Sequence, residues 1–164
     1  MNKSLSDAAG ELIKRAKLVG KTGKPADRVA LNQLVKDTGG RIPAWYVELL
    51  VGFPLAGLEI GWQSDYPTDG YDGIGWMLWN APAGIRSESL ECYPGLAILE
   101  NGWINVASDS AGSGDPYFIP TDKGDDPPVF QIYHDIGEDA EVILAEGCRL
   151  VAPSLSELFQ HAKL

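Results

Sequence analysis

A histidine beside a carboxylate, as in His134-Asp135, is an arrangement that general-base catalysis and metal binding both use. The pair follows a predicted strand, however, and adjacent side chains of a strand point to opposite faces. The second histidine of the chain, His161, lies in a predicted helix, so no partner is spaced to complete a typical zinc site. We therefore predict no catalytic residue, no metal and no cofactor. A hydrolase that uses His134 and Asp135 is the least favoured alternative.

Three further patterns fall short of a recognised chemistry. The run Gly112-Ser113-Gly114-Asp115 lacks the third glycine of a dinucleotide loop and the Gly-Lys-Ser/Thr of a phosphate-binding loop. The serines beside it, Ser108 and Ser110, lack the Gly-x-Ser-x-Gly elbow of a hydrolase. Two acidic clusters do not follow the calcium loop that closes on a glutamate. These clusters are Asp65, Asp69 and Asp72, and Asp122, Asp125 and Asp126. We expect both to be solvated loops.

The segment around these residues predicts two strands joined by a tight turn. Residues 103–108 alternate between apolar and polar, and residues 117–119 form a second short apolar run. Between them, Gly112 and Gly114 adopt positive φ without steric cost, and the Asp and Ser side chains hydrogen-bond their own backbone. A further strand is predicted over residues 128–133.

In this order the segment resembles the SUKH superfamily, which includes bacterial immunity proteins and the yeast Smi-type regulators of cell-wall synthesis. Its members carry a strand ending near Ala-Ser-Asp, a Gly-x-Gly-Asp-like turn, an aromatic strand and a Pro-Val strand ending in His-Asp. Residues 42–50 and 153–159 also resemble the family, although Val51-Gly52-Phe53-Pro54 departs from the Asn-Gly-Gly of many members. The resemblance covers residues 27–163.

The resemblance implies a structural role for a set of motif residues and a hydrogen bond from the His134 ring within the loop at the end of the sheet. The motif residues are Trp45, Gly112, Gly114, Asp115, Pro116, Tyr117, Val129, His134 and Asp135.

The rest of the chain predicts helices first, then strands, then one helix, which is the order of an α+β fold. Helices are predicted over residues 5–19, 25–38, 44–51 and 82–91. Strands are predicted over residues 57–62 and 74–79, in a hairpin over 96–107 across Asn101-Gly102, and within 140–151. Ser154 and Glu157 form a capping box that starts the final helix. We expect a mostly antiparallel mixed sheet of about six strands in a single domain, 1–164, with residues 1–24 as a candidate for a loosely attached N-terminal helix.

The net charge of −10 is distributed unevenly along the 164 residues. Residues 1–41 carry a net charge of +5, and residues 42–164 carry −15. Such a field repels nucleic acid and attracts a basic protein partner. The chain has no apolar run of membrane-spanning length and no basic-then-apolar leader at its start, so we expect a cytoplasmic protein. Cys92 and Cys148 are expected to be reduced thiols.

Together these observations favour a non-enzymatic binding protein. The resemblance implies an immunity protein that neutralises a cognate bacterial toxin, often a nuclease, and a basic toxin domain is the expected partner. The alternative is an intracellular regulatory scaffold of the yeast type. Trp76 and Trp79 have opposite parity on one strand, so they cannot both face the core in a regular pairing: either one of them is exposed or both pack under loops. The candidate partner-binding residues are Asp65, Tyr66, Asp69, Tyr71, Asp72, Asp109 and Asp115.

Overall fold

Six strands form one antiparallel sheet in the order β1-β2-β3-β4-β5-β6, so each strand pairs only with its neighbours along the chain. The computed structural model describes residues 1–164. The strands are β1 (Glu59–Gln63), β2 (Ile74–Trp79), β3 (Trp103–Asp109), β4 (Tyr117–Pro120), β5 (Val129–Ile132) and β6 (Cys148–Ala152). The predicted α+β class is confirmed, and every pairing is antiparallel.

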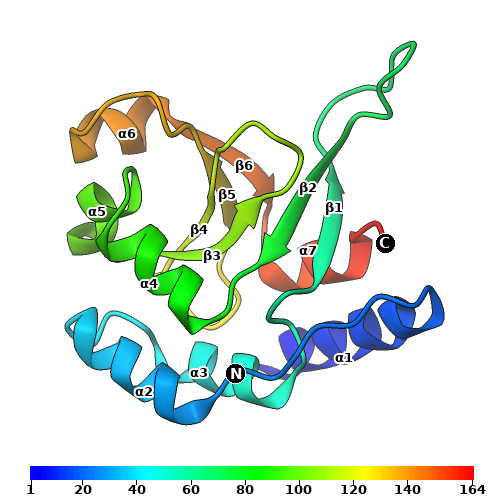
Figure 1. Cartoon of the computed structure of the whole chain (residues 1–164), viewed down its shortest axis with the longest axis horizontal. Coiled ribbons are helices and arrows are strands. Elements are labelled where there is room, and N and C mark those ends of the chain that lie inside the picture. The colour runs from blue at the N-terminus through cyan, green and yellow to red at the C-terminus, as the bar shows by residue number, and fades with distance from the viewer.

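The helices lie on either side of the curled sheet. The first three and the last are α1 (Lys3–Leu18), α2 (Arg28–Asp37), α3 (Ala44–Gly52) and α7 (Leu155–His161). The connections between strands contain α4 (Pro82–Leu90), α5 (Gly95–Ile98), the 3-10 turn η1 (Leu99–Asn101) and α6 (Ala140–Glu146). Figure 1 shows α1, α2 and α3 in a layer below the sheet, with α5 and α6 at its left.

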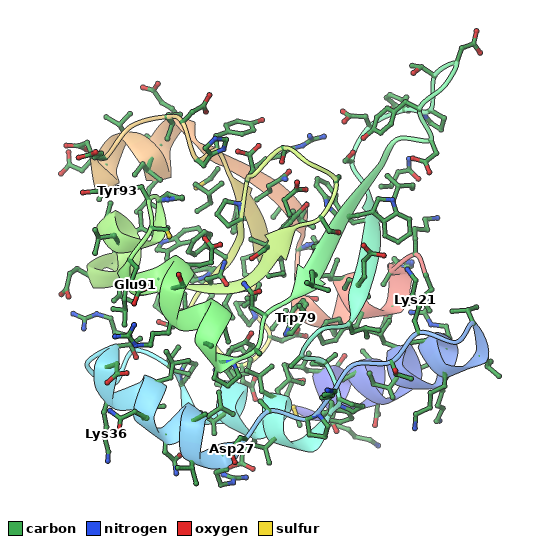
Figure 2. The ribbon with its side chains drawn as sticks, in the orientation of Figure 1. Lys21, Asp27, Lys36, Trp79, Glu91 and Tyr93 are labelled. Carbon is green, nitrogen blue, oxygen red and sulfur yellow. The ribbon has the colours of Figure 1, made fainter.

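The main core fills the space between the sheet and the helices α1, α3 and α7. Trp79 of β2 is 1% exposed, and its ring centroid lies 5.2 Å from that of Phe159 in α7. Figure 2 shows Trp79 pointing into this interior. Trp76, on the other face of the same strand, is partly exposed and lies under the Lys21 ammonium at 4.5 Å. Only Trp79 faces the core, as the opposite parity of the two tryptophans requires.

The sheet curls until its two edge strands approach each other. Arg149 of β6 reaches across to β1, where its guanidinium lies 5.1 Å from the ring centroid of Trp62. Beyond β1 the same guanidinium donates to the carbonyl oxygen of Ser64 and pairs with Asp65 at 3.1 Å. The result is a half-barrel with an inner face that carries Trp62 and Tyr117.

The pairing order places alternate connections at the same end of the half-barrel. Residues 64–73, 110–116 and 133–147 join β1 to β2, β3 to β4 and β5 to β6, so all three lie at one end. Figure 1 shows the β1–β2 connection extending beyond the rest of the molecule, with the other two connections along the same upper side.

Residues 1–24 are not a loosely attached arm, which corrects the expectation for this segment. Leu5, Ala9 and Leu12 of α1 are fully buried in the main core. Arg15 donates to the carbonyl oxygens of Phe159 and Ala162 at the end of the chain. Six apolar residues at helical spacing give α1 a buried face, and α7 supplies the surface that covers it.

Two predicted strand regions are helical instead. Residues 96–101 form α5 and η1, and Gly102, with φ of +79°, ends this turn rather than serving a hairpin. Residues 140–146 form α6, because the Asp139 side chain accepts from two backbone N–H groups and caps the helix. Only β6, after Gly147, keeps the predicted extended form. A short apolar run is typical of a buried helix as well as of a strand, so the periodicity of residues 96–101 and 140–146 does not distinguish the two structures.

We predict that Leu12→Ala lowers the free energy of unfolding by about 2–5 kcal/mol, because it leaves a cavity in the main core. Leu18→Ala, in the same helix at a position that is 86% exposed, should change it by less than about 0.5 kcal/mol. Denaturant unfolding measures both. Equal, small effects would show that α1 does not contribute to the core.

Candidate functional site

The three connections at one end of the sheet are rich in carboxylates and contain no lysine or arginine. We call residues 64–73, 110–116 and 133–147 the acidic rim. Its carboxylates are Asp65, Asp69, Asp72, Asp115, Asp135, Glu138, Asp139, Glu141 and Glu146. The basic residues of the first 41 positions lie mainly on α1, α2 and the chain near them, on the far side of the sheet. Figure 2 shows Lys36 on α2 at the opposite side of the molecule from the β1–β2 connection.

The β1–β2 connection is a projecting hairpin. Thr68 and Tyr71 bridge its tip around Gly70, which has φ of +87°. The Tyr66 side chain is 93% exposed. Asp69 is exposed and accepts no hydrogen bond, so its charge is available to solvent.

The β3–β4 connection is held by Asp109, whose role is partly structural. Its Oδ2 accepts from the backbone N–H groups of Gly112, Ser113 and Gly114 at 2.6, 2.7 and 3.2 Å. Gly112 and Gly114 have φ of +103° and +81°, which only glycine adopts without strain. The predicted strand–turn–strand is confirmed. The other oxygen of Asp109, Oδ1, accepts no hydrogen bond from the protein.

His134 pairs with Asp115, not with its neighbour Asp135. A single Asp115 oxygen, Oδ1, lies 2.7 Å from His134 Nδ1 and accepts the His134 backbone N–H at 3.0 Å. This hydrogen bond and the Asp115 charge raise the pKa of His134 above its ordinary value. The pair connects the β5–β6 connection to the β3–β4 connection. It is the hydrogen bond of the His134 ring that the resemblance implies for the loop at the end of the sheet.

Inside the rim, the mouth of the half-barrel is hollow, with a volume of about 270 Å³. Four of the predicted partner-binding residues line it: Asp65, Tyr71, Asp109 and Asp115. The other three, Tyr66, Asp69 and Asp72, lie on the hairpin outside the hollow, where Asp72 Oδ1 accepts from the Ile74 N–H. The structure therefore places the seven residues at one end of the molecule, in two neighbouring groups.

Tyr117 and Gln131 form the polar floor of the hollow. The phenol oxygen of Tyr117 accepts from Trp62 Nε1 and from Gln131 Nε2, both at 3.2 Å. Burial raises the pKa of Tyr117 to about 12, so the phenol keeps its proton at neutral pH. Tyr133 and Arg149 complete the wall.

The remaining motif residues support this end of the sheet or lie in the core. The carbonyl oxygen of Pro116 accepts from the Ile132 N–H at 2.9 Å, and Val129 is fully buried. Trp45 packs against the main core, with its ring centroid 5.5 Å from that of Tyr46. Asp135 is exposed.

Sequence reasoning missed the acidic residues of the β5–β6 connection and the floor of the hollow. Glu138, Glu141 and Glu146 belong to the rim because α6 is a helix at this end of the sheet. The run Asp139-Ala140-Glu141, a capping residue followed by a carboxylate in the first turn, was a readable signal for that helix. Nothing in the sequence pattern placed Gln131 beside Tyr117, since that contact depends on the register of β4 and β5.

No three or more His, Cys, Asp or Glu side chains come together as a metal-binding group. In the second acidic cluster, Asp126 caps α7 by accepting from the Ser156 N–H and hydroxyl at 2.8 and 2.6 Å. None of the helices has both the length and the apolar character needed to cross a membrane.

Comparisons of the chain with family models, with curated proteins and with solved structures find no significant match. The fold and the acidic rim therefore supply the argument for function.

We predict that an NMR titration gives His134 a pKa above about 6.5, and that Asp115→Asn lowers it. Because the folded-state pKa is raised, the pair contributes its full stability below about pH 6.5 and loses it as pH rises through the raised value. The difference in Tm between the wild type and Asp115→Asn should therefore shrink from about pH 5 to about pH 8. A difference that does not change with pH would contradict the pairing. His161→Gln assigns the two imidazole signals.

Proposed function

We propose that this protein is a non-enzymatic, SUKH-type binding domain that acts as an immunity protein and neutralises a basic bacterial toxin domain through its acidic rim. The observation that carries the proposal is the charge of that rim. Nine carboxylates in three connections share one end of the sheet, and no lysine or arginine lies among them. A toxin that cuts nucleic acid presents a basic cleft to its substrate, and a surface of opposite charge occupies such a cleft.

The projecting hairpin supplies the aromatic contact that such a complex needs. Charge steers two proteins together, but most of the binding energy of an interface comes from a few buried aromatic or arginine side chains. Tyr66 is 93% exposed and Tyr71 is 45% exposed, and both lie between acidic residues. We propose that Tyr66 is the residue that is buried most when the partner binds.

The basic side of the molecule is less available for the same role because several of its charges are already paired. Arg28 binds Glu48 with both guanidinium nitrogens at 2.7 and 2.9 Å. Lys21 pairs with Glu59 at 3.3 Å, and Arg41 pairs with Glu100. Two of the nine rim carboxylates are paired, Asp65 with Arg149 and Asp115 with His134. The acidic end therefore keeps more unpaired charge than the basic side.

We predict that Asp69→Lys combined with Glu138→Lys slows association with the captured basic partner by about tenfold at low salt and weakens the dependence on salt. Neither carboxylate accepts a hydrogen bond, so the double variant changes charge without removing a structural contact. Asp7→Lys with Glu11→Lys makes the same change in net charge on the exposed face of α1 and should leave the rate near that of the wild type.

The experiment starts from a pull-down with tagged wild-type protein in the source cells and continues with stopped-flow or surface-plasmon kinetics on the captured partner. Equal slowing in both double variants would show that net charge, rather than the rim, controls association. If the captured partner is a nuclease, stoichiometric wild-type protein should abolish its activity. A partner without toxin activity, encoded away from this gene, would instead favour the regulatory scaffold.

A further inference from the structure

The hollow in the half-barrel mouth contains oxygen atoms that have no hydrogen-bond donor. Gln131 is 7% exposed and lines the hollow. Its Nε2 donates to the Asp115 carbonyl oxygen at 3.3 Å, and a carbonyl can only accept, so the orientation of the amide is fixed. The amide oxygen, Oε1, then accepts no hydrogen bond from the protein. This oxygen is open to the hollow, so a donor that enters the hollow can reach it.

Two carboxylate oxygens of the same hollow are also free. Asp109 accepts three N–H groups on Oδ2 alone, and Asp115 accepts from His134 on Oδ1 alone. Asp109 Oδ1 and Asp115 Oδ2 accept nothing from the protein. The hollow thus offers three acceptor oxygens that no protein donor reaches, from three different residues, two of them charged.

The cation already present does not satisfy these acceptors. Arg149 also lines the hollow, but its guanidinium is held by Ser64, Asp65 and the Trp62 ring and donates to none of the three oxygens. The lining therefore keeps more negative than positive charge, with Asp65, Asp109 and Asp115 against Arg149. Aromatic rings of Tyr71 and Tyr133 also line the hollow, and such rings favour a cation over an anion.

We propose that the hollow binds one guanidinium or ammonium group, presented by an arginine or lysine side chain of the protein partner. Such a group carries several N–H donors and a positive charge, which match three acceptors and a net negative wall. A volume of about 270 Å³ is just below the range for drug-sized ligands and admits the end of one side chain. The assignment of this group to a protein partner rests on the proposed function, whereas the expectation that the hollow binds a cation does not.

The test is an NMR titration of ¹⁵N-labelled protein with N-acetyl-arginine methylamide at constant, low ionic strength. The Gln131 side-chain amide and the amides of Gly112 and Gly114 should shift. N-acetyl-citrulline methylamide, which has the same shape without the charge, should leave them in place. Shifts of equal size with both compounds, or shifts with CaCl₂ and none with the arginine compound, would overturn the proposal.

Variants separate this hollow from the rim as a whole. Asp115→Asn keeps an acceptor for His134 and should weaken binding of the arginine compound by about tenfold. Asp69→Asn removes the same charge outside the hollow and should weaken it by less than about twofold. Gln131→Met removes the free amide oxygen and should also weaken binding, which keeps the test valid if Asp115→Asn disturbs the loop. Equal effects of Asp69→Asn and Asp115→Asn would refute a specific site.

A competition assay tests the source of the group. The arginine compound at saturation should displace the captured basic partner, whereas the citrulline compound should not. Binding of the compound without displacement would refute the partner as the source and leave the hollow as a site for a free cation. If the arginine compound causes no shifts in the wild type, the proposed site in the hollow is refuted. The proposed function would still stand if the rim variants slow association with the partner.

Discussion

Arg149 shapes the end of the molecule to which we assign function. Its guanidinium stacks on Trp62, donates to the Ser64 carbonyl oxygen and pairs with Asp65, so one side chain of β6 holds the far edge of the sheet. The pairing order alone does not bring the edge strands β1 and β6 together, because an antiparallel sheet with this order can also remain open. The cross-connection brings the first and third acidic connections to opposite sides of one mouth, and the Tyr117–Gln131 floor lies between them.

The order of pairing explains why charge is concentrated. In a sheet where each strand pairs only with its sequence neighbours, connections alternate between the two ends. The connections at one end carry the acidic rim, and those at the other contain α4, α5 and the turn before β5. Because the apolar face of α1 is buried against α7, Lys3, Lys14 and Lys17 of this helix are exposed. The uneven charge of the sequence thus becomes two separate surfaces.

Local signals predicted much of the fold. The strand predicted over residues 74–79 matches β2 over its full length, and Ser154 begins the final helix as predicted. Residues 96–101 and 140–146 were assigned to strands because short apolar runs do not distinguish a strand from a buried helix. The sequence predicted some of the residues that line the hollow but not its floor or Arg149. Asp109 and Asp115 belong to readable turns, whereas Gln131 and Arg149 reach the mouth through strand register and sheet curl, which no local pattern encodes.

The most direct measurement of the central claim is hydrogen–deuterium exchange of the protein alone and in complex with its captured partner. Our account predicts that the partner slows exchange in residues 64–73, 110–116 and 133–147 and leaves α1 and α2 unchanged. Protection confined to α1 and α2, with the three connections exchanging as in the free protein, would contradict it.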